Sequence, residues 1–151
     1  MRRSSPSEMR PIFLVDTRET EPYSFSPERA AIVRRALPAG DYSLEGMEQR
    51  VAVERKTLED LVQTVIRERE RFRRELKLLA DYEAACVVVE AHLSDVLAGR
   101  YRSAAYPRSV LGAVISIILD HEVPVFFCGD RPCARQFTEA YLLRFHRKSQ
   151  T

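Results

Sequence analysis

Short apolar runs and long amphipathic stretches alternate along the chain. The runs at 12–15, 86–91 and 124–128 contain almost only apolar residues. Runs of this length without polar interruptions are typical of strands that are buried on both faces of a sheet. The first run ends directly before Asp16, so the sequence places this carboxylate at a strand end.

A β-hairpin is predicted between 39–44 and 50–54. The two segments flank Glu45-Gly46-Met47-Glu48, a sequence that favours a turn. Pairing of the two strands would bring Asp41 close to Glu54.

Helical segments are predicted between and after these strands. Ser26 and Pro27 are typical of a helix start and predict a short helix that ends near Leu37. Thr57 and Asp60 resemble a capping box at the start of a helix of about 25 residues, to about Tyr82. Further helices are predicted at 92–99, 107–121 and 131–148, and that at 107–121 is apolar nearly all round, which implies burial. Strands separated by helices, together with one hairpin, predict an α/β domain with a mixed central β-sheet flanked by helices.

Composition limits the class of protein. With 151 residues, 45% hydrophobic and 30% charged, the chain fits one domain and excludes a disordered or fibrous protein. The net charge of +2 means that any basic site must be local. The longest apolar stretch, 110–119, is about half of the roughly 20 residues that a membrane span needs. Residues 1–9 have no apolar signal-peptide core, so we expect a flexible tail before a domain at 10–148. Three cysteines without a CxxC pair favour a reducing cytoplasm.

Three residues of the strand-turn-strand unit could perform phosphodiester chemistry. Glu54 and Lys56 lie two positions apart, so they share one face of a strand, and the hairpin adds Asp41. Carboxylate oxygens suit Mg²⁺ or Mn²⁺, and a neighbouring lysine can stabilise the charge that develops on a phosphate. The same spacing also fits a surface ion pair of Glu54 with Lys56 beside a turn acid.

The predicted long helix carries an arginine within its apolar stripe. The stripe consists of Leu61, Val65, Phe72, Leu76 and Leu79, and Arg69 occupies its missing position. A buried or half-buried guanidinium there would need a protein carboxylate or a substrate phosphate. The segment 67–77 has six basic and three acidic residues, which is typical of a solvated helix face.

These motifs together resemble the XPF-type nuclease domain. They are Val15-Asp16-Thr17-Arg18-Glu19, Gly40-Asp41-Tyr42, and Val53-Glu54-Arg55-Lys56 with Asp60 and Arg69 beyond, in the order of that family and over nearly the whole chain. The resemblance implies a restriction-endonuclease-like fold of the PD-(D/E)xK type. It also implies metal-dependent cleavage of branched, flap or fork DNA, in repair or recombination.

The resemblance also assigns roles to single residues. Asp41 and Glu54 would hold the metal, Mg²⁺ or Mn²⁺, with the backbone carbonyl of Arg55, and Lys56 would be the catalytic lysine. Asp16 and Glu19 would hold a second metal or orient a water. Arg18 and Arg69 would lie near the scissile phosphate. Arg55 and Asp60 would organise the site.

The sequence departs from the family pattern in two ways. Glu68 precedes Arg69 where the family usually has glycine. We expect a stand-alone domain without a helix-hairpin-helix domain after residue 148. Such a domain would rely on a homodimer or a partner protein, with the helices at 107–121 and 131–148 as candidate surfaces. An alternative is a non-catalytic DNA-binding scaffold that recruits another nuclease. A nuclease for linear duplex, DNA ends or RNA would use the same residues.

Overall fold

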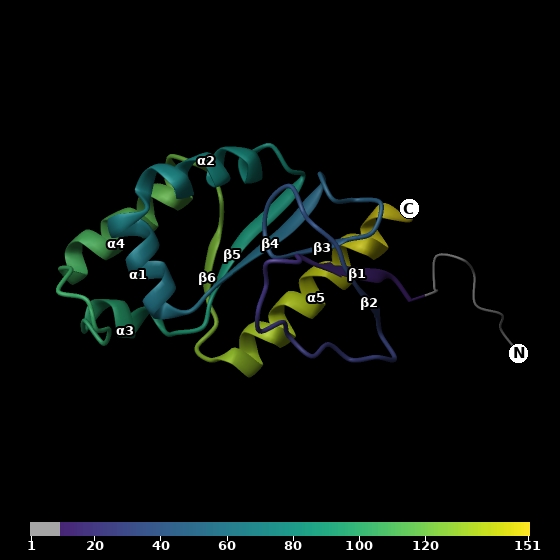
Figure 1. Ribbon diagram of the computed structural model, residues 1–151, viewed down its shortest axis with the longest axis horizontal. Coiled ribbons are helices and arrows are strands. Elements are labelled where there is room, and N and C mark those ends of the chain that lie inside the picture. Colours follow the sequence, from purple (N-terminus) through teal and green to yellow (C-terminus); the bar gives the residue numbers. More distant parts are fainter. Residues whose placement is uncertain (1–9) are drawn as a thin grey trace, which may run out of the picture.

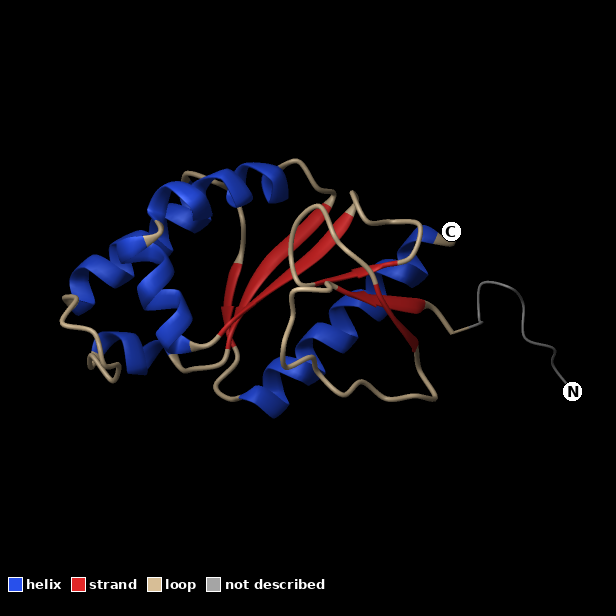
Figure 2. Ribbon diagram, viewed as in Figure 1, coloured by secondary structure: helices blue, strands red, loops and turns tan. Residues whose placement is uncertain are grey.

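The computed structural model describes residues 10–151, so the predicted tail at 1–9 lies outside the described residues. A six-stranded sheet forms the centre of the molecule (Figures 1 and 2). Its strands are β1 (Ile12–Val15), β2 (Ala31–Arg34), β3 (Tyr42–Leu44), β4 (Val51–Lys56), β5 (Ala84–Val89) and β6 (Val125–Phe127). The helices are α1 (Leu58–Arg67), α2 (Arg69–Ala80), α3 (Leu93–Leu97), α4 (Pro107–Leu119) and α5 (Arg131–Ser149).

The sheet is mixed, in the order β2-β1-β3-β4-β5-β6. β3 is antiparallel to β1 and β4, whereas β1–β2, β4–β5 and β5–β6 are parallel pairs. The α/β class with a mixed central sheet is therefore confirmed, and so is the hairpin. β4 and β5 pair along their whole length, from Val51 opposite Ala84 to Lys56 opposite Val89.

Helices cover the two faces of the sheet differently. α5 runs along one face, and α1, α2 and α4 gather on the other (Figure 1). Each layer has its own apolar core: α5 buries Leu142 with Phe13 and Val88, whereas the second core contains Leu61, Leu76 and Val114 with residues of β4 and β5. Because apolar side chains on both faces fix β4, its last residues are held rigidly at the edge where α1 begins.

The helix predicted after Ser26 is wrong. Residues 27–29 form a turn, and Ala31–Arg34 form strand β2, which pairs in parallel with β1. Alternate residues of β2 are exposed, as expected for an edge strand with one covered face. The local helix signal of Ser26 and Pro27 is overridden by the hydrogen bonds that β1 offers along its edge.

The single long helix is wrong as well. The chain forms α1 and α2, which are separated at Glu68, a residue with φ −116° and ψ 36°. Thr57 does begin α1, since its side chain accepts a hydrogen bond from the amide of Asp60 at 3.1 Å. The break redirects α2, so that both helices bury their apolar stripes against one core.

α4 is not buried on all sides. Val110, Val114 and Ile117 face the core, but Ile115 and Leu119 are 45% and 70% exposed. α4 covers one edge of the sheet, and no described helix covers its outer side. None of the helices within residues 10–151 has the length and apolarity needed to cross a membrane.

Candidate active site

A polar cleft of about 330 Å³ lies between the ends of β3 and β4 and the helices α1 and α2. It contains most of the site residues that the sequence predicts. Those in its lining are Asp16, Arg18, Asp41, Glu54, Lys56 and Asp60. The rest of the lining consists of residues for which the sequence predicted no role in the site: Gly40, Gln63, Thr64, Glu68, Arg71, Phe72 and Glu75.

Asp41 is held by the backbone of the hairpin. Its amide donates to the carbonyl of Val53 at 2.9 Å, and its Oδ2 accepts the amide hydrogen of Arg55 at 2.8 Å. Gly40 has φ +78°, and a Cβ there would lie 3.0 Å from that of Ala52, so glycine is needed for this close approach. Burial raises the pKa of Asp41 to about 6, with help from Glu19 and Glu75 and against the Arg55 hydrogen bond.

Glu54 projects from β4 into the cleft and is only 6% exposed. Its Oε2 lies 3.4 Å from Nζ of Lys56, so the predicted same-face pair exists, but inside the cleft and not on the surface. Burial, followed by the negative charges of Asp41 and Glu75, raises the pKa of Glu54 well above its ordinary value. A carboxyl group that is buried beside two other carboxyl groups favours the binding of a cation, because the cation neutralises their charge.

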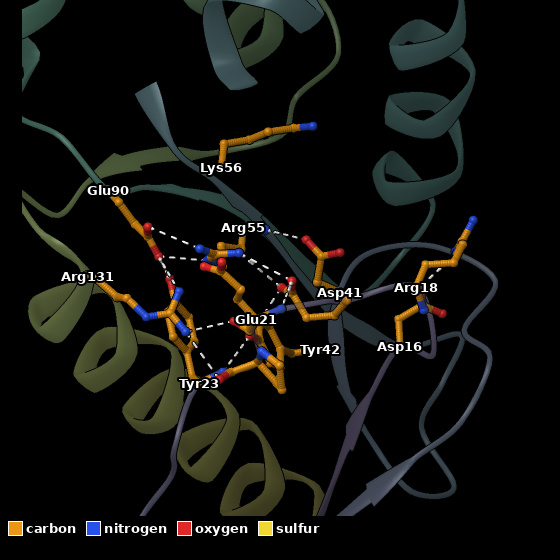
Figure 3. A network of polar contacts seen from close by, with 12 residues as sticks. Asp16, Arg18, Glu21, Tyr23, Asp41, Tyr42, Arg55, Lys56, Glu90 and Arg131 are labelled. Atoms are coloured by element: carbon orange, nitrogen blue, oxygen red, sulfur yellow. Dashed lines mark hydrogen bonds and ion pairs between the residues drawn. The ribbon is translucent and has the colours of Figure 1, made fainter. Parts of the chain in front are cut away.

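Lys56 is positioned by contacts from both helices. Its Nζ lies 3.3 Å from Oγ1 of Thr64 on α1 and 5.3 Å from the centre of the Phe72 ring on α2. Together with Glu54, these groups fix the ammonium without burying it fully, since the side chain is 16% exposed. Figure 3 shows Lys56 extending away from the ion pairs of its neighbour Arg55.

Asp16 belongs to the cleft, but its oxygens already have partners. Oδ1 accepts the amide of Leu37 at 2.8 Å, and Oδ2 accepts Nε of Arg18 at 2.7 Å. Burial alone would raise the pKa of Asp16, but these hydrogen bonds lower it overall. Asp16 therefore orients Arg18, whose side chain is 72% exposed and lines the cleft.

Glu19 and Arg55 lie outside the cleft lining and form a separate network with Glu90. Figure 3 shows the contact between Arg55 and Glu90. Arg55 is 3.3 Å from Glu19 and 2.7 Å from Glu90, and each of these side chains is at most 11% exposed. Tyr23 donates to Glu90 at 2.6 Å, and Tyr42 donates to Glu19 at 3.3 Å. The network supports the backbone of Arg55 that holds Asp41.

The placement predicted for Arg69 is wrong. It is exposed at the first position of α2 and lines a different groove, with Ile66 and with His121 near the end of α4. The break at Glu68 changes the helical phase, so the apolar stripe passes through Phe72 without a position for Arg69 in the core. Arg71 is the arginine of α2 that lines the cleft.

Asp60 combines a structural and a site position. Its amide donates to the N-cap Thr57, and its carboxylate lies in the first turn of α1, where it complements the helix dipole. It also lines the cleft.

Glu75 is the main residue that the sequence analysis missed. Its Oε1 accepts the amide hydrogen of Gly40 at 3.2 Å, and its negative charge helps to raise the pKa of Glu54. A signal exists in the sequence: Glu68, Arg71 and Glu75 are spaced by three and four residues, so they share one face of α2 beside Phe72. Because the segment has so many charged residues, this spacing identifies Glu75 only when the position of the buried apolar stripe of α2 is known.

The donor set of the cleft fits a small divalent cation. Within residues 10–151, no three His, Cys, Asp or Glu side chains are placed to hold an ion by themselves. Mg²⁺ keeps several waters and is usually bound by only one or two protein carboxylates. Asp41 and Glu54 supply two such oxygens in a desolvated place, so the residues present fit Mg²⁺ or Mn²⁺.

Comparison with known proteins identifies the family. The model of the ERCC4 domain matches residues 15–140, a range that includes all of the cleft residues. The chain belongs to the ERCC4 domain family. The resemblance to an XPF-type nuclease domain is thereby confirmed.

The chain is also similar to individual proteins. MJ1505 of Methanocaldococcus jannaschii, which carries the name of an ATP-dependent RNA helicase, is 35% identical over 114 residues, 76% of this chain. Two structures of XPF from Aeropyrum pernix, one of them a complex with DNA, match 93% of this chain at 25% and 26% identity, with TM-scores of 0.65 and 0.66. The chain spans 13% of MJ1505 and 65% and 66% of the XPF chains. This chain therefore has the family and the fold of an XPF-type nuclease domain.

Proposed function

We propose that this ERCC4 domain is an endonuclease that uses Mg²⁺ or Mn²⁺ to hydrolyse phosphodiester bonds of DNA. The observation that carries the proposal is the meeting of Asp41, Glu54 and Lys56 in one polar cleft, with an ammonium 3.4 Å from a buried carboxyl group. An ion pair with a purely structural role would not need two further carboxylates, those of Asp41 and Glu75, in the same desolvated cleft. Such crowding of like charges is costly to folding and is characteristic of functional sites.

Each residue of the cleft has a task in this reaction. Asp41 and Glu54 would hold the cation, with the Arg55 carbonyl as a further oxygen. When bound, the cation would lower the pKa of a water and neutralise charge on the phosphate. Lys56 can donate a hydrogen bond to the attacking water or to a phosphate oxygen that gains charge in the transition state.

Arginines at the mouth of the cleft can orient the substrate. Arg18 is held by Asp16, and Arg71 projects from α2 into the same lining. A guanidinium forms two parallel hydrogen bonds to a phosphate, so it fixes orientation as well as position. Glu19, tied to Arg55 and Tyr42, would support the site and not bind a second metal.

Branched, flap or fork DNA is the proposed substrate, in repair or recombination. The support is the family resemblance, together with a similar structure, XPF from Aeropyrum pernix, that was solved with DNA. RNA also belongs among the test substrates, because MJ1505 is named as an RNA helicase. A homodimer or a partner protein stays a prediction of the sequence.

The test is cleavage of end-labelled flap, fork, duplex and single-stranded DNA and of a matched RNA, with Mg²⁺, Mn²⁺ or EDTA. Glu54→Gln is the matched inactive variant, which controls for contaminating nucleases. Metal-dependent cleavage that disappears in the variant and is strongest on branched DNA would support the whole proposal. Binding without any cleavage would contradict it and favour a scaffold that recruits another nuclease.

A further inference from the structure

The junction of α1 and α2 presents an unusual concentration of arginines. Five of them, Arg67, Arg69, Arg71, Arg73 and Arg74, line one open hollow of about 570 Å³, and we call them the arginine rim. Arg71 also lines the active-site cleft, so the rim is continuous with it. The rim exists because the chain breaks at Glu68, so that the last turn of α1 and the first turns of α2 line the same hollow.

The charge of the rim is poorly balanced. Two glutamates face five arginines within 67–74, a net charge of +3 in a chain whose total is +2. Arg71 pairs with Glu68 at 3.2 Å and Arg73 pairs with Glu70 at 3.4 Å. In both pairs at least one side chain is more than three-quarters exposed, so each contributes little to stability.

Three arginines of the rim have no acidic partner. Within the described range 10–151, Arg67, Arg69 and Arg74 form no ion pair, and all three are exposed. Glu68, at the N-cap of α2, makes no capping hydrogen bond either, so the positive end of that helix adds to the same field. The hollow thus combines guanidinium groups with a helix end of the same sign.

The chemistry of the rim fits a phosphodiester backbone. Successive phosphates of a strand repeat about every 3.4 Å along a duplex, so a strand with one phosphate in the cleft must place others beside it. Guanidinium groups bind such phosphates through paired hydrogen bonds and read no base sequence. An acidic protein would satisfy the charge as well, but it would have no reason to lie against a cleft that is built for phosphate chemistry.

We propose that the arginine rim binds the DNA backbone next to the cleaved phosphate and so determines the path of the substrate over α2. The inference rests on the proposed function, because it assumes that DNA occupies the cleft. Arg71 would contact the strand at the cleft, and Arg67, Arg69 and Arg74 would contact phosphates further along. The break in the helix, absent from the sequence prediction, is then what makes this surface.

The experiment compares two triple variants that remove the same charge. The rim variant is Arg67→Gln/Arg69→Gln/Arg74→Gln. The control variant is Arg144→Gln/Arg147→Gln/Lys148→Gln in the last turns of α5, a basic region that borders a different hollow. Binding of a fluorescein-labelled fork DNA is measured by anisotropy in EDTA, at several salt concentrations, so that the result is independent of cleavage.

We expect the rim variant to bind at least tenfold more weakly in low salt. Its slope of log affinity against log salt should be shallower by about two to three, since each lost phosphate contact contributes about 0.9. The control variant should keep the wild-type slope. An unchanged slope in the rim variant, or an equal loss in both variants, would overturn the inference, as would a wild-type protein that does not bind the fork.

The same two variants separate the inference from the proposed function. If wild type binds the fork through the rim but cleaves no substrate with either metal, the proposed hydrolysis fails and the backbone-binding surface stands. If wild type cleaves and the rim variant cleaves and binds equally well, the inference fails and the proposed function stands. Thermal unfolding of each variant verifies that the exposed substitutions leave the fold intact.

Discussion

The carboxyl group of Glu75 on α2 accepts the amide hydrogen of Gly40 at 3.2 Å, directly before Asp41 on the hairpin. Glu75 also lines the same cleft as Glu54 of β4. The pKa of Glu54 is raised, first by burial and then by the nearby charges of Asp41 and Glu75. The carboxyl groups of Asp41, Glu54 and Glu75 thus give the cleft a negative potential, which a bound divalent cation would neutralise.

Substitution Glu75→Gln should weaken Mn²⁺ binding. Glutamine keeps a hydrogen-bond acceptor for the amide of Gly40 but removes a negative charge from the cleft. Groups just outside the ligand shell typically contribute about 10- to 100-fold to metal affinity, and we expect a loss of about tenfold. Isothermal titration with Mn²⁺ near neutral pH measures it, and Glu70→Gln, on α2 but outside the cleft lining, is the control. Equal affinities of the Glu75 variant and wild type would refute a role of Glu75 near the cation.

The raised pKa values predict how stability depends on pH without metal. Burial raises the pKa of Asp41 to about 6 and that of Glu54 well above its ordinary value, so the folded state holds these protons more tightly than the unfolded chain. The stability that they confer is therefore complete below about pH 4 and is lost as the pH rises through 6. Glu54→Gln removes the part of this loss that Glu54 causes, so in EDTA at pH 8 the variant should be more stable than wild type.

Thermal unfolding in EDTA between pH 4.5 and 8 measures this effect. The melting temperatures of wild type and Glu54→Gln should converge at the acid end and separate at the basic end. Glu83→Gln is a control of opposite sign, since the hydrogen bond from Arg50 lowers the pKa of Glu83. Parallel profiles of wild type and Glu54→Gln would contradict a raised carboxyl pKa in the cleft.

The parts that the sequence predicted correctly are those with local causes. The hairpin follows from a turn sequence between alternating strands, and it is the hairpin that brings Asp41 to Glu54. β2 was missed because only pairing with β1 makes a strand of a segment that begins like a helix. The break at Glu68 carries neither proline nor glycine, so Glu75 and Arg71 could not be separated from the other charges of α2. Strand β2 and the break between α1 and α2 both depend on packing between segments that are far apart in the sequence.

Thr64 should position Lys56, the lysine that we propose to be catalytic. Its Oγ1 lies 3.3 Å from Nζ of Lys56, and its side chain is buried on α1. Thr64→Val keeps the shape but removes the hydroxyl, and we expect the single-turnover cleavage rate to fall about tenfold, equivalent to about 1.4 kcal/mol. Thr64→Ser restores the oxygen and should recover most of the rate. Equal rates in the valine and serine variants would show that the hydroxyl does not act through Lys56.

The network behind the site should contribute strongly to stability. Arg55, Glu19 and Glu90 have side chains that are at most 11% exposed, so Glu90→Ala would leave the Arg55 guanidinium with a single, longer ion pair in a buried place. Breaking a buried pair in this way typically costs about 3–5 kcal/mol, which we expect as a loss in the free energy of unfolding. Urea denaturation measures it, with Glu83→Ala as the matched control, because the pair of Glu83 with Arg50 is exposed on both sides. The control should change stability by less than about 1 kcal/mol, and equal losses in the two variants would mean that the Arg55 network is no stronger than a surface pair.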